Sequence, residues 1–277
     1  MGTLYVVATP IGNLEDVTLR ALRVLREADL VLAEDTRRTR ILLSRHDIRT
    51  RPRSFHAHNE AQRSGEVLEA LSRGSSVALV SDAGTPAISD PGERLVAAAI
   101  EAGHAVVPVP GPSAVLSALV ASGLPTAPFL FLGFLPRRRG EQEALLEGIR
   151  DRSETIVLFE SPRRLATTLR RLADSLGSRP ACVARELTKL HEELARGSLP
   201  DLAERFREGT RGEVTLVIGG APRERRVQCD EAPLEAEIRS LLGEGKTARE
   251  IAAALAPRTK LPKRQIYARA LAAREKR

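Results

Sequence analysis

The chain has 277 residues, of which 42% are hydrophobic and 3% aromatic, and it contains no tryptophan. This length allows more than one domain, and the cores must be built from Leu, Val, Ile and Ala. No apolar run reaches the ~18 residues of a membrane-spanning helix, and the N-terminal apolar run lacks a preceding basic segment, so neither a membrane span nor a signal peptide is expected.

The net charge is +7 and the isoelectric point is near 10.1, which makes nucleic acid the first partner to consider. The net charge indicates which partners to expect, but it does not indicate the fold. Cys182 and Cys229 lie far apart and lack the spacing of metal ligands. We therefore expect two unpaired thiols in a cytoplasmic protein and no bound metal.

Apolar runs alternate with helical patterns along most of the chain. Strands are predicted at 4–8, 30–33, 77–80, 105–108, 129–133, 155–159, 181–184 and 214–218. Helices are predicted at 18–28, 37–45, 59–73, 91–102, 113–122, 138–150, 163–176 and 199–208. This alternation predicts α/β domains whose parallel or mixed sheets are covered by helices, with ligands bound beyond the carboxyl ends of the strands.

Two segments rich in Gly and Pro, 123–128 and 219–226, interrupt the pattern. They predict an α/β domain at 1–124, a second at 125–221, and a linker followed by a small all-helical module at 222–277. Helices of the module are predicted at 234–242, 247–255 and 262–273. Thr247 and Glu250 have the spacing of a capping box at the start of the second of these helices.

Unusual residues follow four of the predicted strands, at 8–14, 34–39, 81–92 and 108–114. The first of these loops has neither the glycines of a dinucleotide fingerprint nor the Lys of a P-loop. Taken singly, each loop is compatible with ordinary turn chemistry, and Asp82 and Asp90 could be helix N-caps. Together, four stiff loops at one sheet edge predict a preorganised pocket for a ligand without a pyrophosphate.

Eight ordered segments between residues 3 and 220 carry a family resemblance. They are ATPIGNLEDVTLRAL, EDTRRTR, SFHAHNE, SDAGTPAISDPG, PGPSA, FESPRRL, ARELTKLHEE and RGEVTLVIGG. In this combination the chain resembles the tetrapyrrole-methylase superfamily, and in particular its ribosomal RNA branch. The resemblance implies S-adenosylmethionine bound between two α/β domains, and a homodimer. It also implies 2′-O-methylation of a cytidine in the decoding centre of 16S rRNA, with the rRNA carried in the small ribosomal subunit.

The resemblance also implies a set of cofactor-binding residues from both domains. They are Pro10, Ile11, Gly12, Asp82, Ala83, Gly84, Thr85, Pro86, Ile88, Ser113, Ala114, Phe159, Glu160, Ala184, Arg185, Glu186, Glu213 and Val214. Pro86 and Pro91 would stiffen the central loop before the cofactor binds and so reduce the entropy lost on binding. Bulky side chains at Ala83 or Gly84 would close the site.

Methyl transfer to a ribose hydroxyl requires in-line alignment and a group that accepts the hydroxyl proton. The leading candidates for this role are Glu34, Asp35, His58 and Glu60, and further candidates are Glu160, Glu186 and Lys189. Glu34 or Asp35 could instead cap the helix that begins near Thr36, and His58 could cap a helix or be solvated.

Basic residues near the predicted site and in the tail are candidates for RNA contacts. They are Arg37, Arg38, Arg40, Arg163, Arg164, Lys189, Arg249, Lys263, Arg264 and Arg269. The tail resembles a helix-turn-helix, with a predicted core of Ile251, Leu255, Ile266, Ala270 and Leu271 and exposed basic residues that include Lys260. Phosphate contacts would suit such a module. The alternative is a helical hairpin that only packs on the dimer.

Two other functions remain open at this stage. One is methylation of a small tetrapyrrole, against which the sparse aromatic residues and the basic tail argue. The other is a nucleic-acid-binding regulator with an inactive methylase core, against which the intact loops argue.

Overall fold

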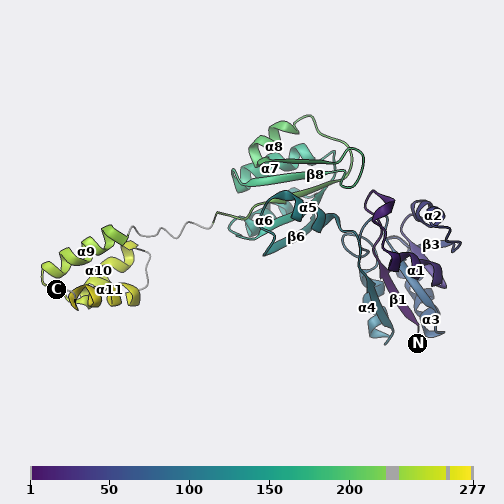
Figure 1. Cartoon of the computed structure of the whole chain (residues 1–277), viewed down its shortest axis with the longest axis horizontal. Coiled ribbons are helices and arrows are strands. Elements are labelled where there is room, and N and C mark those ends of the chain that lie inside the picture. The colour runs from purple at the N-terminus through teal and green to yellow at the C-terminus, as the bar shows by residue number, and fades with distance from the viewer. Residues whose placement is uncertain (1, 223–230, 260–262, 276–277) are drawn as a thin grey trace. The chain divides into compact units, whose positions relative to one another are not determined.

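A computed structural model of the chain describes residues 2–222, 231–259 and 263–275. They form two compact units, Met1–Ala221 and Pro222–Arg277 (Figure 1). Cys229, Lys260 and most of the predicted linker lie outside the described residues. None of the helices in the described ranges is long and apolar enough to cross a bilayer. Cys182 is a buried free thiol.

The first sheet is entirely parallel, with the strand order β3-β2-β4-β1-β5. Its strands are β1 (Thr3–Val7), β2 (Leu30–Ala33), β3 (Pro52–Ser54), β4 (Ser76–Val80) and β5 (Ala105–Val109). The central strands β1, β2 and β4 are short runs of aliphatic residues, as expected for strands covered on both faces. Because all five strands are parallel, the loops that follow them lie at one edge of the sheet.

Helices cover both faces of this sheet. One face packs against α1 (Leu19–Glu27) and α2 (Thr36–Arg45), and the other against α3 (Glu60–Ser72) and α4 (Glu93–Glu101). A short 3-10 helix, η1 (Leu14–Asp16), follows β1. The helix α1 begins where the Thr18 hydroxyl accepts a hydrogen bond from the amide of Ala21.

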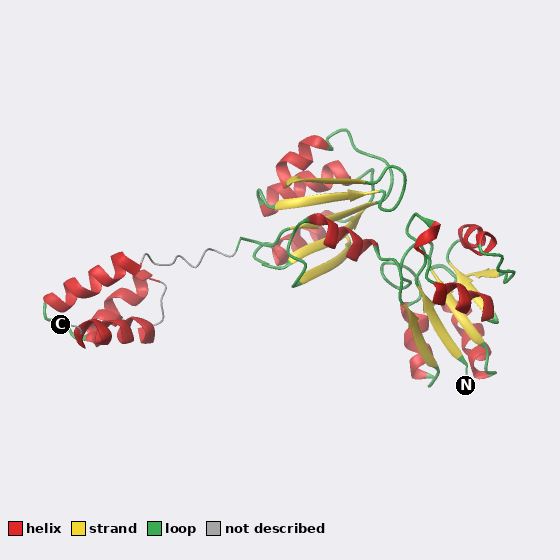
Figure 2. Ribbon diagram, viewed as in Figure 1, coloured by secondary structure: helices red, strands yellow, loops and turns green. Residues whose placement is uncertain are grey.

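The second sheet is mixed, with the order β6-β7-β10-β8-β9. Its strands are β6 (Phe129–Phe134), β7 (Thr155–Glu160), β8 (Pro180–Arg185), β9 (Glu193–Ser198) and β10 (Val214–Ile218). β6 and β7 are parallel, and the other neighbouring pairs are antiparallel. Figure 2 shows the two sheets as separate groups of yellow strands in the unit Met1–Ala221.

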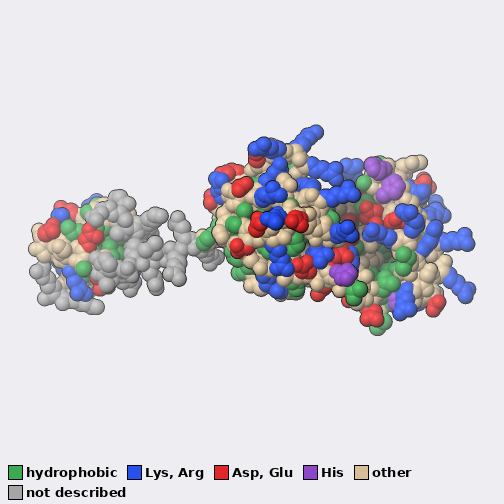
Figure 3. Space-filling model, turned by 90° about the horizontal axis from the view of Figure 1, so that it is seen from above, with side chains coloured by type: hydrophobic (Ala, Val, Ile, Leu, Met, Phe, Trp, Pro, Cys, Tyr) green, Lys and Arg blue, Asp and Glu red, His purple; other side chains and the backbone are tan. Residues whose placement is uncertain are grey.

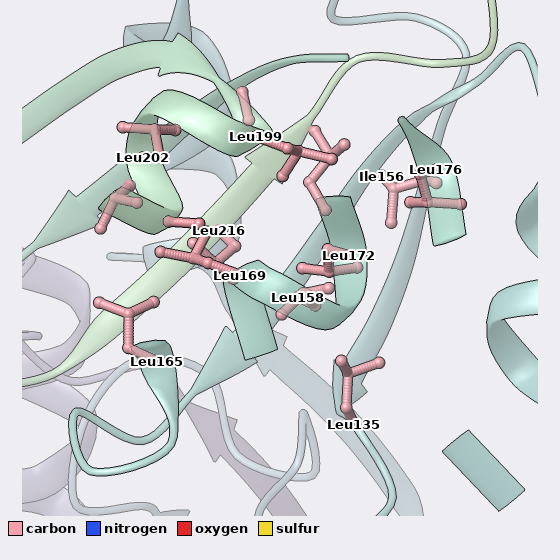
Figure 4. Packing of buried hydrophobic residues seen from close by; sticks show 14 of the residues in the cluster. Leu135, Ile156, Leu158, Leu165, Leu169, Leu172, Leu176, Leu199, Leu202 and Leu216 are labelled. Atoms are coloured by element: carbon pink, nitrogen blue, oxygen red, sulfur yellow. The ribbon is translucent and has the colours of Figure 1, made fainter. Parts of the chain in front are cut away.

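The second sheet is also covered on both faces. The helices α6 (Arg139–Ile149), α7 (Leu165–Leu176) and α8 (Leu199–Arg205) form one leucine-rich core with it (Figure 4). The helix α5 (Ala114–Ser122) packs on the other face, against β7, β8 and β10. The chain therefore changes sheets before α5, whereas the predicted domain boundary at 124 follows it. That boundary stays a prediction.

The second unit consists of α9 (Glu231–Gly243), α10 (Ala248–Thr259) and α11 (Lys263–Glu275). The predicted capping box is confirmed, because the Thr247 amide donates to Glu250 and the Glu250 amide donates to the Thr247 hydroxyl. Of the predicted core residues, Ile251, Leu255, Ile266 and Ala270 are buried. Leu271 is 38% exposed, so its placement in the core was wrong. Residues of α9, including Leu234 and Ile238, complete the core instead.

Every strand and helix that the sequence predicts in the described ranges is present, with ends within a few residues. Two strands were missed, β3 and β9. Both are edge strands, and neither sequence has a continuous apolar run, because an edge strand buries less of its surface than a central one.

Candidate active site

A cavity of about 370 Å³ lies in the unit Met1–Ala221 where loops of the two sheets meet. This volume lies in the range of small-molecule sites. Its lining consists of Ile11, Ala83, Gly84, Thr85, Ile88, Ser89, Asp90, Ser113, Ala114, Val115, Phe134, Phe159, Glu160, Ser161, Pro162, Ala184, Leu187, Glu213, Val214 and Thr215.

The cavity brings together most of the residues predicted to bind a cofactor. Those that line it are Ile11, Ala83, Gly84, Thr85, Ile88, Ser113, Ala114, Phe159, Glu160, Ala184, Glu213 and Val214. Those that do not line it are Pro10, Gly12, Asp82, Pro86, Arg185 and Glu186. Lining residues that the sequence reasoning did not assign to the site are Ser89, Asp90, Val115, Phe134, Ser161, Pro162, Leu187 and Thr215.

Hydrogen bonds join the loops that follow β1 and β4 beside the cavity. The amides of Thr9 and Gly84 donate to each other's carbonyl oxygens, at 2.9 and 3.0 Å, and the Thr9 hydroxyl donates to the Ser81 carbonyl. Gly84 has a φ of +76°, in the left-handed region that favours glycine. The two loops are therefore locked together before any ligand binds.

The loop between β4 and α4 carries two non-glycine residues in left-handed conformations, Ala87 at φ 67° and Ser89 at φ 64°. Such conformations are costly and cluster at functional sites. Glu60 supports this loop, because its Oε1 accepts a hydrogen bond of 3.1 Å from the amide of Gly92. Glu60, a predicted proton acceptor, thus has a positioning contact in the structure.

Three carboxylates, Glu34, Asp82 and Asp90, gather at this edge of the first sheet. Burial and the charge of Asp82 raise the pKa of Glu34 above its usual value. Burial and the charges of Glu34 and Asp82 raise the pKa of Asp90 to about 6. Asp82 is held by the amide of Asp35 at 2.8 Å and by the Arg38 guanidinium at 3.7 Å. Neither Asp82 nor Asp90 caps a helix: the residue before α4 is Gly92.

Two other predicted proton acceptors, Asp35 and His58, lie in surroundings that differ from those of the carboxylate cluster. Asp35 is the N-cap of α2, and its hydrogen bonds with the Arg37 side chain and amide lower its pKa to about 2. A carboxylate with so low a pKa is a weak base. His58 is exposed, and its ring contacts the ring of His56 at a centroid distance of 5.9 Å.

Glu160 ends β7 with a fully buried side chain. Its Oε2 accepts from the Thr168 hydroxyl at 2.6 Å, and its Oε1 accepts from the Ser161 amide at 2.8 Å and faces Arg164 at 3.4 Å. Arg164 also donates to the carbonyl of Leu135. The Glu160 carboxylate and the Arg164 guanidinium therefore both have partners within the protein, and Glu160 fixes the start of the loop that lines the cavity.

A second cluster joins the two halves beside the cavity. The Lys189 ammonium bridges Glu186 at 2.9 Å and Glu213 at 3.0 Å. A Cβ at Gly12 would come within 2.5 Å of the Lys189 side chain, so glycine permits this close approach. The amide of Asn13 donates to the Thr188 hydroxyl at 3.0 Å. Of this cluster, Glu213 also lines the cavity, whereas Lys189, Glu186 and Thr188 support the wall from behind it.

Two phenylalanines form an aromatic wall on the side of the second sheet. The rings of Phe134 and Phe159 have centroids 5.5 Å apart, and Phe131 packs edge-on against Phe159 at 5.1 Å. Phe134 is 54% exposed although it is a large apolar residue. A small-residue loop on one side and an aromatic wall on the other suit a flat, partly apolar ligand.

The family model of the Tetrapyrrole (Corrin/Porphyrin) Methylases matches residues 3–203. The chain belongs to this family. It is 48% identical over 269 residues to a protein of Synechocystis sp. named Ribosomal RNA small subunit methyltransferase I, with 96% of each chain covered. A Bacillus subtilis protein of the same name is 42% identical over 273 residues, which cover 96% of this chain and 93% of the relative.

Solved structures of the same fold are more distant in sequence. Uroporphyrin-III-C-methyltransferase from Thermus thermophilus has a TM-score of 0.56 at 24% identity, covering 79% of this chain and 94% of that one. Diphthine synthase has a TM-score of 0.63 at 17% identity, covering 79% and 90%. These structures confirm the predicted two-sheet methylase fold.

The methyl donor of this methylase is S-adenosylmethionine, and the lining of the cavity fits it. The donor supplies a methyl group bonded to a positively charged sulfur. Gly84, Ala83 and Ala114 leave room along one wall, while Phe159 offers an apolar face.

The predicted RNA contacts are dispersed around the methylase. Arg37 pairs with Asp35, Arg38 lies near Asp82, and Arg40 and Arg163 are exposed. Arg164 and Lys189 are held in the ion pairs described above. In the tail, the exposed basic residues are Arg249, Lys263 and Arg264, whereas Arg269 is half-buried. Figure 3 shows Lys and Arg spread over one face of Met1–Ala221, with acidic side chains between them.

Proposed function

We propose that this methylase transfers a methyl group from S-adenosylmethionine to the ribose 2′-hydroxyl of a cytidine in the decoding centre of 16S rRNA. The observation that carries the proposal is the similarity, at 42–48% identity over nearly the whole chain, to proteins named Ribosomal RNA small subunit methyltransferase I. The solved tetrapyrrole methyltransferases share the fold at no more than 24% identity, so they do not favour a porphyrinoid acceptor.

The residues of the cofactor site follow from the cavity. Ala83, Gly84 and Thr85 would lie along the donor on one side, with Ser113 and Ala114 at the start of α5 and Phe159 on the other side. The side-chain hydroxyl of Ser113 is already used to cap α5 through the amide of Leu116. Contacts to the donor from this turn would therefore come mainly from the backbone and from Ala114.

Exposed basic residues in both units support an RNA substrate, which we propose the protein methylates within the small subunit. Arg40 and Arg163 are exposed in the first unit, and Lys263 and Arg264 are exposed in α11. Basic side chains of this kind bind the phosphate backbone and position the substrate without reading its sequence. The proposal places the reaction in the cytoplasm, where ribosomal subunits assemble.

A homodimer is part of the proposal, and the outer side of α5 supports it. The helix packs Val115, Ala118 and Leu119 on the second sheet, while Leu116 and Val120 are 52% and 69% exposed. Two large apolar residues one turn apart on an exposed helix face are suited to contact with a second copy.

The proposal is tested with labelled S-adenosylmethionine and small ribosomal subunits from a strain that lacks this methylase. Naked 16S rRNA and uroporphyrinogen III serve as parallel acceptors. Label should enter the rRNA of the subunits and should appear as 2′-O-methylcytidine after digestion to nucleosides. Transfer to uroporphyrinogen III alone, or label on a base instead of a ribose, would contradict the proposal. Light scattering at several concentrations tests the dimer.

A further inference from the structure

Methylation of a ribose hydroxyl releases the hydroxyl proton, and a nearby group has to accept it. The hydroxyl is a weak nucleophile, and general-base catalysis by a positioned side chain typically contributes about 10²–10⁴-fold in rate. If the acceptor is a ribose hydroxyl, as the proposed function requires, the side chain that accepts this proton should be found among the acids that line the cavity.

Among the acids that line the cavity, two are already engaged. Glu160 has both oxygens committed to Thr168, Ser161 and Arg164, and its side chain is fully buried. Glu213 pairs with Lys189 at 3.0 Å and is 61% exposed. A carboxylate held by a cation gives up part of its basicity, and one buried in hydrogen bonds cannot reach a substrate.

Asp90 is the third acid of the lining, and it forms no ion pair with any described residue. The loop that carries it is fixed on both sides of the residue. Ser89 before it is in the left-handed region, and the amide of Gly92 after it is held by Glu60. Gly133 of β6 approaches this loop closely, since a Cβ there would lie 3.1 Å from the Ser89 hydroxyl. The carboxylate of Asp90 is therefore both available and preorganised.

The charges around Asp90 keep its basicity high. Burial has the largest effect on its pKa, and the charges of Glu34 and Asp82 raise it further, whereas the polar side chain of Ser81 opposes the rise. The resulting pKa of about 6 lies near the working pH, as a general base requires. The charged and titratable groups of the surrounding elements are Glu34, Asp82, Arg38, His56 and Glu60, with Glu160 and Glu213 across the cavity.

We propose that the Asp90 carboxylate accepts the proton of the ribose 2′-hydroxyl as the hydroxyl oxygen bonds to the methyl carbon. The carbon–sulfur bond breaks at the same time, and its electron pair returns to sulfur, which loses its positive charge. Asp90 then releases the proton to solvent. Glu34 and Asp82 act as positioning residues that set the basicity of Asp90.

The first test compares Asp90→Asn with the unsubstituted protein on small subunits at pH 8 and saturating substrates. The expected result is a fall in kcat of about 100-fold or more. The donor dissociation constant, measured by calorimetry, should change by less than about threefold. Asp174→Asn, an exposed position on α7 away from the cavity, is the matched control and should leave both values unchanged.

The second test uses the pH profile of kcat. In the unsubstituted protein kcat should fall as the pH drops through about 6, because protonated Asp90 cannot accept a proton. Glu34→Gln removes a neighbouring negative charge, lowers the pKa of Asp90 and should move this fall to lower pH. Asp90→Glu retains a carboxylate, so it should retain the fall and part of the activity.

A third readout does not involve activity. The pKa of Asp90 is raised on folding, so its ionisation destabilises the folded state as the pH rises through about 6. Asp90→Asn should therefore raise the melting temperature at pH 8, relative to the unsubstituted protein, by more than it does at pH 4. This measurement also shows whether the variant folds.

The results separate the possible failures. An Asp90→Asn protein with kcat within threefold of the unsubstituted protein would overturn the inference. So would a large loss of donor affinity with unchanged kcat, which would make Asp90 a donor ligand. If the unsubstituted protein binds the donor but methylates no rRNA, the proposed function itself fails and the inference fails with it.

Discussion

The hydrogen bond from Thr168 to Glu160 offers a sharp test of how the buried part of the site is stabilised. Thr168 is 2% exposed on α7, and its hydroxyl donates to the Oε2 atom of Glu160 at 2.6 Å. Thr168→Val replaces the hydroxyl by a methyl group and leaves the shape of the side chain nearly unchanged. The variant therefore removes a donor from a buried carboxylate without opening a large cavity.

The magnitude follows from the surroundings of Glu160. Its Oε1 atom keeps the amide of Ser161 and the guanidinium of Arg164, whereas Oε2 has Thr168 as its partner. A hydrogen bond to a charged group contributes about 1.5–3 kcal/mol, and a buried acceptor that loses its donor falls in that range. We expect the free energy of unfolding to fall by about 2 kcal/mol. For a unit of this size, that lowers the melting temperature by roughly 4–8 °C.

The matched control is Thr167→Val, because Thr167 is the neighbouring residue on the same helix and is exposed. It changes helix propensity equally but breaks no contact with Glu160, so its effect should stay within about 0.5 kcal/mol. Urea unfolding followed by circular dichroism, with the donor absent, measures both variants. Equal stability of the two variants would refute the assignment of the Thr168–Glu160 hydrogen bond as a main support of this loop.

Three further predictions concern the cavity and the tail. Gly84→Ala places a Cβ on a residue with φ +76° and should lower the free energy of unfolding by about 1–2 kcal/mol. Its control is Gly65→Ala, in α3 with open space around it, which should raise the free energy of unfolding by about 0.5–1 kcal/mol. Thermal unfolding measures both. Ala83→Leu narrows the cavity, and calorimetry should show at least tenfold weaker donor binding in a folded protein. Charge reversal of Lys263 and Arg264 to Glu should weaken binding to small subunits and reduce the salt dependence of that binding, which filter binding at several salt concentrations measures. The affinity for the donor should stay unchanged.

The central strands and the helices could be predicted because their residues obey simple patterns. β4 is a continuous aliphatic run, and α1 has a threonine cap and an amphipathic sequence. β3 and β9 could not be predicted in this way. Pro52–Ser54 is three residues long and begins with a proline, and Glu193–Ser198 contains only two adjacent apolar residues, Leu194 and Ala195, among charged and small residues. Both exist because a neighbouring strand supplies the hydrogen bonds, and no local sequence pattern records that neighbour.

The residues that line the cavity could be predicted where a recognisable motif follows a strand. They could not be predicted where only the packing between the two sheets brings a residue to the cavity. Gly84 and Ala114 stand in recognisable turns, and both line the cavity. Phe134 and Leu187 lie there because the second sheet presents them to the first, which no spacing in the sequence indicates. Asp90 was visible in its motif but could be taken for a helix cap. Only the observation that Gly92 occupies the cap position separates the two roles.

The turn at Ser113–Ala114 connects the two halves of the unit at the cavity. It follows β5 of the first sheet, lines the cavity, and begins α5, which packs on the second sheet. The far end of α5 is tied to β9, because Arg196 donates to the Ser122 carbonyl at 3.1 Å. A second link between the halves is the hydrogen bond from the Asn13 amide to the Thr188 hydroxyl. The width of the cavity is therefore set by packing between the sheets, and a substitution that loosens α5 should weaken donor binding even though it touches no lining residue.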